Sequence, residues 1–199
     1  MNSENINPPD SALTRSGLLL SRDRSCLLVV DVQERLLPTI ADHPSLLSAV
    51  QLLVRSARRL QIPIVVSEQY PKGLGSTVTQ LTEDLLGTTR FEKLRFSAAE
   101  GLQPLLKRDL SQIVLCGIET HVCILQTALD LISEGLQVFV VADAVGSNSV
   151  DDRRVALQRM RDSGCTIISA ESVVFEWCET AAAAEFKDLS RLVREHRTS

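Results

Sequence analysis

The chain has 199 residues, of which 44% are hydrophobic and 23% are charged, and its formal net charge is −4 at pH 7. This length and composition predict one domain with a sizeable buried core. The scattered Lys and Arg residues exclude a basic surface for nucleic acid or membrane, and no apolar run approaches the roughly 18 residues needed to span a bilayer. We therefore expect a small-molecule ligand, with no nucleic-acid partner and no membrane partner.

Residues 1–22 are expected to form an N-terminal arm or surface strap, and the main domain is expected to span 23–199. The arm begins with polar and acidic residues and contains one short Leu patch, so neither a signal peptide nor a transit peptide is expected. The chain has five cysteines and no CxxC pair. This pattern favours a reducing compartment, and we expect a cytoplasmic protein without a disulfide framework.

Short apolar runs alternate with segments of helical periodicity along the rest of the chain. Strands are expected at 26–31, 62–68, 112–117, 137–143 and 165–170, with a weaker candidate at 89–93. Helices are expected at 45–60, 101–110, 121–135, 150–164 and 181–196. Continuous apolar strands separated by helices indicate an α/β fold with a parallel sheet that is covered on both faces.

Residues directly after these strands are the first candidates for function, because ligands of open α/β sheets bind beyond the carboxyl ends of the strands. Asp31 and Lys93 end two expected strands, and Cys123 follows a third, in the first turn of a helix. Taken singly, each has a common structural role as a turn, surface or core residue. Together they predict a nucleophilic site, because a helix N-terminus lowers the pKa of a thiol, an Asp accepts its proton and a Lys stabilises charge.

The three histidines, His43, His121 and His196, are far apart in the sequence and form no zinc-binding motif. We therefore expect no metal site. His121 is two residues from Cys123, and residues two apart on a helix face different directions. A role in surface or loop packing is expected for His121, instead of a Cys–His dyad. The glycine-rich stretch 72–75 precedes no P-loop helix, and no cofactor is expected.

Five stretches of the chain carry a family resemblance: LLVVDVQERL (27–36), SEQYPKGLGSTV (67–78), FEKLRFSA (91–98), CGIETHVCILQTALDL (116–131) and VVADAVGSNSVDDRRVALQRMRDSG (140–164). Over about residues 25–175, the chain resembles the isochorismatase-like superfamily, and within it the cysteine hydrolases called isochorismatase domain-containing hydrolases. The resemblance implies a three-layer, Rossmann-like α/β fold. Its six-stranded parallel sheet would have the order 3-2-1-4-5-6, with 89–93 as the third strand.

The resemblance also implies a mechanism. Cys123 would attack a carbonyl carbon to form an acyl-enzyme, Asp31 would act as general base and pass the proton to the leaving group, and Lys93 would hold the site electrostatically. The backbone N–H groups of Glu119 and Cys123 would form an oxyanion hole, and the Ile118–Glu119 peptide bond would be cis. A homo-oligomer is expected because members of the family habitually assemble.

Two departures from family patterns narrow the expected activity. Nicotinamidases of this superfamily carry a metal-binding Asp-x-His pair after strand two, where this chain has Glu68, Gln69 and Tyr70 and no histidine between 44 and 120. Authentic isochorismatases lack the nucleophilic cysteine. We therefore expect a metal-independent cysteine hydrolase of a small amide or related acyl compound. Two alternatives stay open: a binding or regulatory protein with this fold, and a redox-responsive thiol protein.

The interpretation of the remaining candidates is less specific. Gln33 could reach a polar group of a substrate, although an isolated Gln is more often a surface residue. Tyr70 and Phe96 could line the pocket, with core packing as the alternative for Phe96. Trp177 is expected in core packing or in a subunit contact. Asp143 is expected to organise its loop through hydrogen bonds from backbone groups to its side chain.

Overall fold

A six-stranded parallel sheet forms the centre of the molecule. The computed structural model describes residues 14–106 and 109–198. The strands are β1 (Ser25–Val30), β2 (Ile64–Gln69), β3 (Thr89–Lys93), β4 (Gln112–Ile118), β5 (Gln137–Gly146) and β6 (Thr166–Ile168). Their order is β3-β2-β1-β4-β5-β6, which confirms the expected topology and the weak candidate at 89–93. Every residue of β1, β2 and β4 is buried, which explains why β1 and β4 are largely apolar instead of alternating; β2, IVVSEQ, ends in three buried polar residues.

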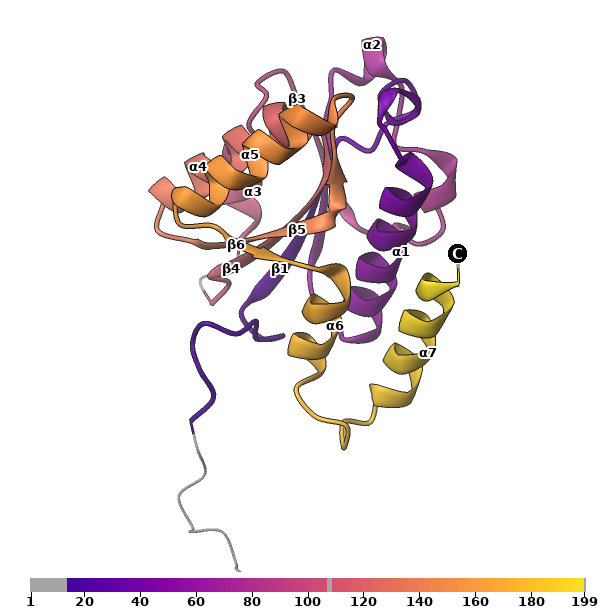
Figure 1. Ribbon diagram of the computed structural model, residues 1–199, viewed down its shortest axis with the longest axis vertical. Helices are drawn as coiled ribbons and strands as arrows, with labels where there is room; N and C mark the ends of the chain where they lie inside the picture. The colour runs from indigo at the N-terminus through magenta and orange to yellow at the C-terminus, as the bar shows by residue number, and fades with distance from the viewer. Residues whose placement is uncertain (1–13, 107–108, 199) are drawn as a thin grey trace, which may run out of the picture.

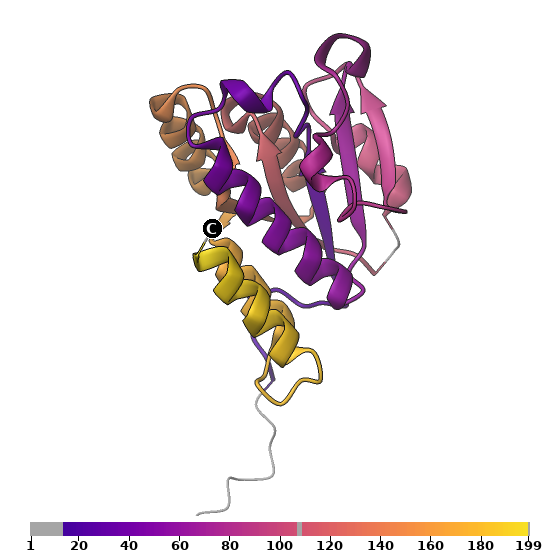
Figure 2. The same cartoon turned by 90° about the vertical axis from the view of Figure 1, so that its right-hand side faces the viewer.

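Helices cover both faces of the sheet and complete three layers (Figure 1). One face carries α1 (His43–Arg59), α6 (Ala170–Cys178) and α7 (Phe186–Arg197), and Figure 2 shows α1 lying across the sheet with α7 beside it. The other face carries α3 (Ala99–Leu102), α4 (Leu125–Ser133) and α5 (Val150–Asp162). The connections contain α2 (Pro71–Leu74) and three short 3-10 turns, Leu37–Thr39, Thr79–Leu81 and Gln103–Leu105.

Helices α1 and α5 lie within two residues of their expected bounds, whereas the other three expected helices differ more. The segment 101–110 is not one helix, because α3 ends at Leu102 and a 3-10 turn with Pro104 follows; residues 107 and 108 lie outside the described part. The helix expected at 121–135 begins as a π-helical turn, Thr120–Ile124, before α4. The helix expected from 181 begins only at Phe186.

Helix α6 is absent from the sequence-based expectation. Its sequence, AESVVFEWC, is rich in β-branched and aromatic residues, which are weak helix formers. The helix forms because Ser169 caps it by accepting a hydrogen bond from the N–H of Ser172, and because one side packs into the core. Tertiary packing therefore outweighs local propensity in this segment.

The fully buried indole of Trp177 on α6 donates its Nε1–H to the Ser25 hydroxyl at 3.0 Å. Core packing is therefore confirmed for Trp177, and a subunit contact is wrong because the ring has no exposed surface. The segment before β1 lies against the same helix, since Leu20 is fully buried and its N–H donates to Glu176 Oε2 at 2.8 Å. Residues 1–13 of the expected arm lie outside the described part.

Candidate active site

The first charged group of the site is the carboxylate of Asp31, directly after β1. Asp31 adopts a left-handed backbone conformation with φ of 54°, which Asp tolerates better than most residues. Its side chain is completely buried. One oxygen, Oδ1, accepts a hydrogen bond from the Ser67 hydroxyl at 2.7 Å, and the other, Oδ2, lies 2.6 Å from Lys93 Nζ. A buried carboxylate is destabilising unless its oxygens have hydrogen-bond donors, and both oxygens of Asp31 have one.

The matching cation is Lys93, the last residue of β3, whose side chain is 6% exposed. Its Nζ donates to Asp31 Oδ2 at 2.6 Å, to Gln69 Oε1 at 2.7 Å and to the backbone oxygen of Phe96 at 2.9 Å, with the oxygen of Arg95 at 3.3 Å. These acceptors use all three N–H groups of an ammonium. Lys93 is therefore a fixed positive charge beside the carboxylate.

The third member, Cys123, lies after β4 in the π-helical turn. β4 passes so close to β1 that a Cβ at Gly117 would lie 2.0 Å from the carbonyl oxygen of Val30, and the φ of Gly117 is 118°. Only glycine fits at this position. The Ile118–Glu119 peptide bond that follows is cis, the geometry implied by the resemblance. The turn then buries Cys123 to 6% exposure.

Burial is the largest of the effects that together raise the pKa of the Cys123 thiol to about 12; the charge of Asp31 also raises it, whereas the charge of Lys93 lowers it. The expectation that a helix N-terminus activates this thiol by lowering its pKa is therefore wrong. Loss of solvent and the adjacent carboxylate outweigh the opposing effects. The thiol is neutral at pH 7, and the charges of Asp31 and Lys93 act on its pKa in opposite directions. The structure thus brings together the three residues that follow the strand ends.

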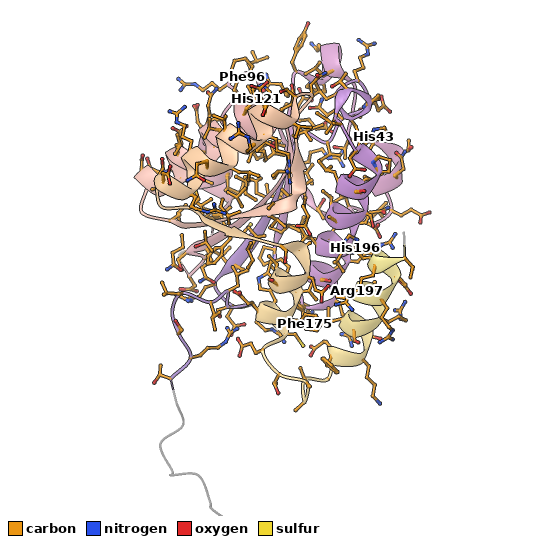
Figure 3. The ribbon with its side chains drawn as sticks, in the orientation of Figure 1. His43, Phe96, His121, Phe175, His196 and Arg197 are labelled. Atoms are coloured by element: carbon orange, nitrogen blue, oxygen red, sulfur yellow. The ribbon has the colours of Figure 1, made fainter. Side chains whose placement is uncertain are left out.

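Two side chains of the segment 118–124 tie it to the loop after β5. Glu119 Oε2 accepts the backbone N–H of Asn148 at 2.9 Å, and His121 Nδ1 lies 3.0 Å from the hydroxyl of Ser147. The loop-packing role expected for His121 is confirmed by this contact. Figure 3 shows His43, His121 and His196 in separate parts of the molecule. Within 14–106 and 109–198, no three His, Cys, Asp or Glu residues form a group that could hold a metal ion.

The structure agrees with neither role expected for Gln33, contact with a substrate or a position on the surface. Its side chain is completely buried, so it is not a surface residue. Its Nε2 donates to the backbone oxygens of Gln69 at 3.0 Å and Gly75 at 2.6 Å, and its Oε1 accepts the N–H of Gln69 at 2.7 Å. The amide is engaged with backbone groups at both ends. It fixes the loop after β2 to the loop after β1 and does not offer a free amide to a substrate.

The two expected aromatic pocket residues lie on the surface. Tyr70 is 50% exposed and Phe96 is 52% exposed, so core packing of Phe96 is wrong. Tyr70 lines a cavity of about 310 Å³ together with Lys93 and Leu94. Phe96 lies at the same end of the molecule as His121, where the strands terminate (Figure 3). Both aromatic side chains are therefore near the triad and outside its buried contacts.

Asp143 does not organise its own loop as expected, because it lies within β5, and its Oδ1 accepts the backbone N–H of Ala170 at the start of α6 at 2.8 Å. Ser67 and Gln69, by contrast, were missed as site residues although they contact Asp31 and Lys93. The available signal was their polarity. In the buried strand IVVSEQ, the side chains at positions 67 and 69 point to the same face.

Comparisons with known proteins agree with this fold. The isochorismatase domain model matches residues 25–172. The mouse isochorismatase domain-containing protein 2A is 42% identical over 175 residues, which cover 87% of this chain and 84% of that protein. The structure of MAR1 ribonuclease from Caenorhabditis elegans superposes with a TM-score of 0.85 at 36% identity, covering 88% of this chain and 92% of that one. The Escherichia coli YcaC gene product, an octameric hydrolase of unknown specificity, superposes with a TM-score of 0.83 at 24% identity, covering 93% and 96%.

Proposed function

The chain belongs to the isochorismatase family, and from this premise we propose that it is a metal-independent cysteine hydrolase of a small amide or related acyl compound. One observation carries the proposal: a neutral, buried thiol lies against a carboxylate that is itself paired with a fixed cation. A neutral thiol is a poor nucleophile and requires a base within reach. Asp31 is that base.

Acylation then proceeds in two steps. The Cys123 S–H bond breaks as its proton passes to the Asp31 carboxylate, while sulfur attacks the carbonyl carbon and the carbonyl electron pair moves to oxygen. The tetrahedral intermediate collapses to a thioester when the C–N bond breaks and the leaving nitrogen takes the proton from Asp31. Lys93 keeps a positive charge beside the Asp31 carboxylate while that carboxylate gains and loses the proton.

Deacylation reverses the roles. A water molecule gives a proton to Asp31 as its oxygen attacks the thioester carbonyl, and the Cys123 thiolate leaves and recovers that proton. We propose the backbone N–H groups of Glu119 and Cys123 as donors to the oxyanion in both halves. The contact between Glu119 and Asn148 supports this role because it anchors the residue that would present one of the donors.

The substrate is proposed to be small, because the triad is nearly closed to solvent. The half-exposed side chains of Tyr70 and Phe96 are proposed to line the approach to it. A cytoplasmic location is also proposed, supported by the buried, free state of all five cysteines in the described part of the chain. No helix of that part is long and apolar enough to cross a membrane.

Two alternatives are less well supported. A redox role requires a thiolate that reacts readily with oxidants, and the raised pKa of Cys123 disfavours that form. The nearest cysteine along the chain, Cys116, packs in the core cluster on the other face of the sheet and cannot serve as a resolving thiol. A binding protein of this fold would not need to bury an Asp–Lys pair against a cysteine, since burial of such a pair costs free energy.

The test is a panel of small amides, assayed for released ammonia or amine with and without EDTA. Wild type and Cys165→Ala are expected to hydrolyse at least one amide at equal rates in both conditions. Cys123→Ala is expected to lose that activity. Cys165 is a matched control because it is also a buried, free cysteine with a raised pKa, about 11. Equal turnover by Cys123→Ala, or loss of wild-type turnover in EDTA, would contradict the proposal.

A further inference from the structure

We propose that Ser67 is a positioning residue for the base, holding the Asp31 carboxylate in place and limiting how tightly it keeps the proton in transit. This inference rests on the proposed function, in which Asp31 takes a proton from Cys123 and returns it to the leaving group. Ser67 touches neither Cys123 nor Lys93 through any of the hydrogen bonds found for it. It acts through Asp31.

Ser67 and Asp31 are joined by two hydrogen bonds that run in opposite directions. The Ser67 hydroxyl donates to Asp31 Oδ1 at 2.7 Å, and the Asp31 N–H donates to the Ser67 carbonyl oxygen at 3.1 Å. Both residues are completely buried. Since β2 is a central strand paired with β1 and β3, the hydroxyl is carried on a rigid element. The pair of bonds fixes both the backbone and the side chain of the base.

The two carboxylate oxygens of Asp31 have different hydrogen-bond partners. Oδ1 is bound to the Ser67 hydroxyl, and Oδ2 is bound to Lys93. Within the described residues, Lys93 from β3 forms an ion pair with Asp31, and Cys123 from the π-helical turn has its pKa raised by the charge of Asp31. Ser67 is therefore the neutral donor of the set. A hydrogen bond from a neutral hydroxyl favours the charged carboxylate and loosens its hold on a proton.

Gln69 has the corresponding role for Lys93. It lies two residues after Ser67, on the same face of β2. Its Oε1 accepts from Lys93 Nζ at 2.7 Å, while its Nε2 donates to the backbone oxygen of Leu94 at 2.9 Å. One strand thus supplies a polar contact to each charged member of the site. An unpaired polar group would be destabilising in a fully buried strand. The contacts with Asp31 and Lys93 therefore account for the two uncharged polar side chains of β2, Ser67 and Gln69.

The test compares Ser67→Ala with Ser56→Ala. Ser56 is also completely buried, and its hydroxyl has no hydrogen-bond partner within the described residues, so its loss removes the same atom without touching the site. We expect Ser67→Ala to lower kcat about 10- to 100-fold with little change in KM, the range for loss of one hydrogen bond to a charged group. The acid limb of kcat/KM should move to higher pH, because the carboxylate now takes up a proton more readily. Ser56→Ala should change neither, and Ser67→Thr, which keeps the hydroxyl, should recover activity.

Wild-type kcat in Ser67→Ala would overturn the proposal, and so would a lower kcat with an unmoved acid limb, since that result indicates only a packing defect. If wild type hydrolyses no amide, the proposed function fails. The positioning role of Ser67 is then tested by comparing the rates at which iodoacetamide alkylates Cys123 in wild type and in Ser67→Ala. Without the Ser67 hydrogen bond, the carboxylate should take the thiol proton more readily, which raises the thiolate fraction and speeds alkylation about threefold or more in Ser67→Ala. Alkylation at the wild-type rate would overturn the inference.

Discussion

Replacement of Asp31 by Asn separates two effects that the carboxylate has on Cys123. The negative charge raises the pKa of the thiol, while the carboxylate oxygens take and return its proton. Asn has the same shape, tolerates the left-handed backbone of residue 31 and can still accept the Ser67 hydrogen bond. The substitution leaves the positive charge of Lys93, which lowers the thiol pKa, without its opposing partner. Reactivity of the thiol and turnover should therefore change in opposite directions.

The expected magnitudes follow from the contact between the groups. An adjacent charge alters the pKa of a neighbouring group by about 1–3, so its removal raises the thiolate fraction at pH 8 about 10- to 1,000-fold. The nucleophilicity of the thiolate falls as its pKa falls, with a Brønsted coefficient of about 0.5. The net increase in alkylation rate is thus about 3- to 30-fold. Turnover should fall at least about 100-fold, the lower limit for loss of a general acid–base.

The assay is the rate of iodoacetamide labelling of the Cys123 peptide, followed by mass spectrometry from pH 7 to 10, beside amide turnover by the same samples. Asp188→Asn is the matched control, because Asp188 lies on α7 and pairs with Arg59 far from the site. It should leave both rates unchanged. Slower labelling in Asp31→Asn, or turnover within about tenfold of wild type, would refute the assignment of Asp31 as the group that both raises the thiol pKa and transfers the proton.

Three further results are expected. Lys93→Met should slow labelling of Cys123 at pH 8, since the cation that lowers the thiol pKa is lost; faster labelling would contradict this electrostatic role. Glu119→Ala should lower kcat about tenfold, whereas Glu119→Gln keeps an acceptor for the Asn148 N–H and should stay within about threefold of wild type; equal losses would argue against anchoring. Native mass spectrometry at micromolar concentration should show a homo-oligomer, as the family resemblance implies, and a monomer alone would oppose that expectation.

The sheet and the three residues at the carboxyl ends of its strands were predictable from the sequence for a simple reason. Strands β1 and β4 are buried at every residue, so their sequences are unbroken apolar runs whose ends can be seen. Asp31 and Cys123 directly follow such runs, whereas Lys93 ends β3, a partly exposed strand whose sequence, TRFEK, is a weaker signal. The parallel sheet then brings the carboxyl ends of these strands together. Helix α6 was not predictable, because its β-branched and aromatic residues disfavour an isolated helix and only packing against the sheet stabilises it.

The chemistry of the thiol depends on distant parts of the chain. Cys123 stands where a helix N-terminus should lower its pKa, but burial and Asp31 raise it, and neither effect can be read from neighbouring residues. Likewise, Gln33 reads as an exposed residue of a polar loop until the loop after β2 folds over it and takes up its amide. Ser67 and Asp31 are 36 positions apart, and only the pairing of β1 with β2 makes them neighbours.

Direct detection of an acyl-enzyme tests the central claim. Wild-type protein is mixed with an amide substrate identified from the panel, quenched in acid within milliseconds to seconds and digested for mass spectrometry. The peptide that contains Cys123 should gain the mass of the acyl group as a thioester that is lost on treatment with hydroxylamine, and Cys123→Ala should show neither the adduct nor turnover. Steady turnover by Cys123→Ala, or a stable acyl adduct on another residue in wild type, would contradict a Cys123 nucleophile.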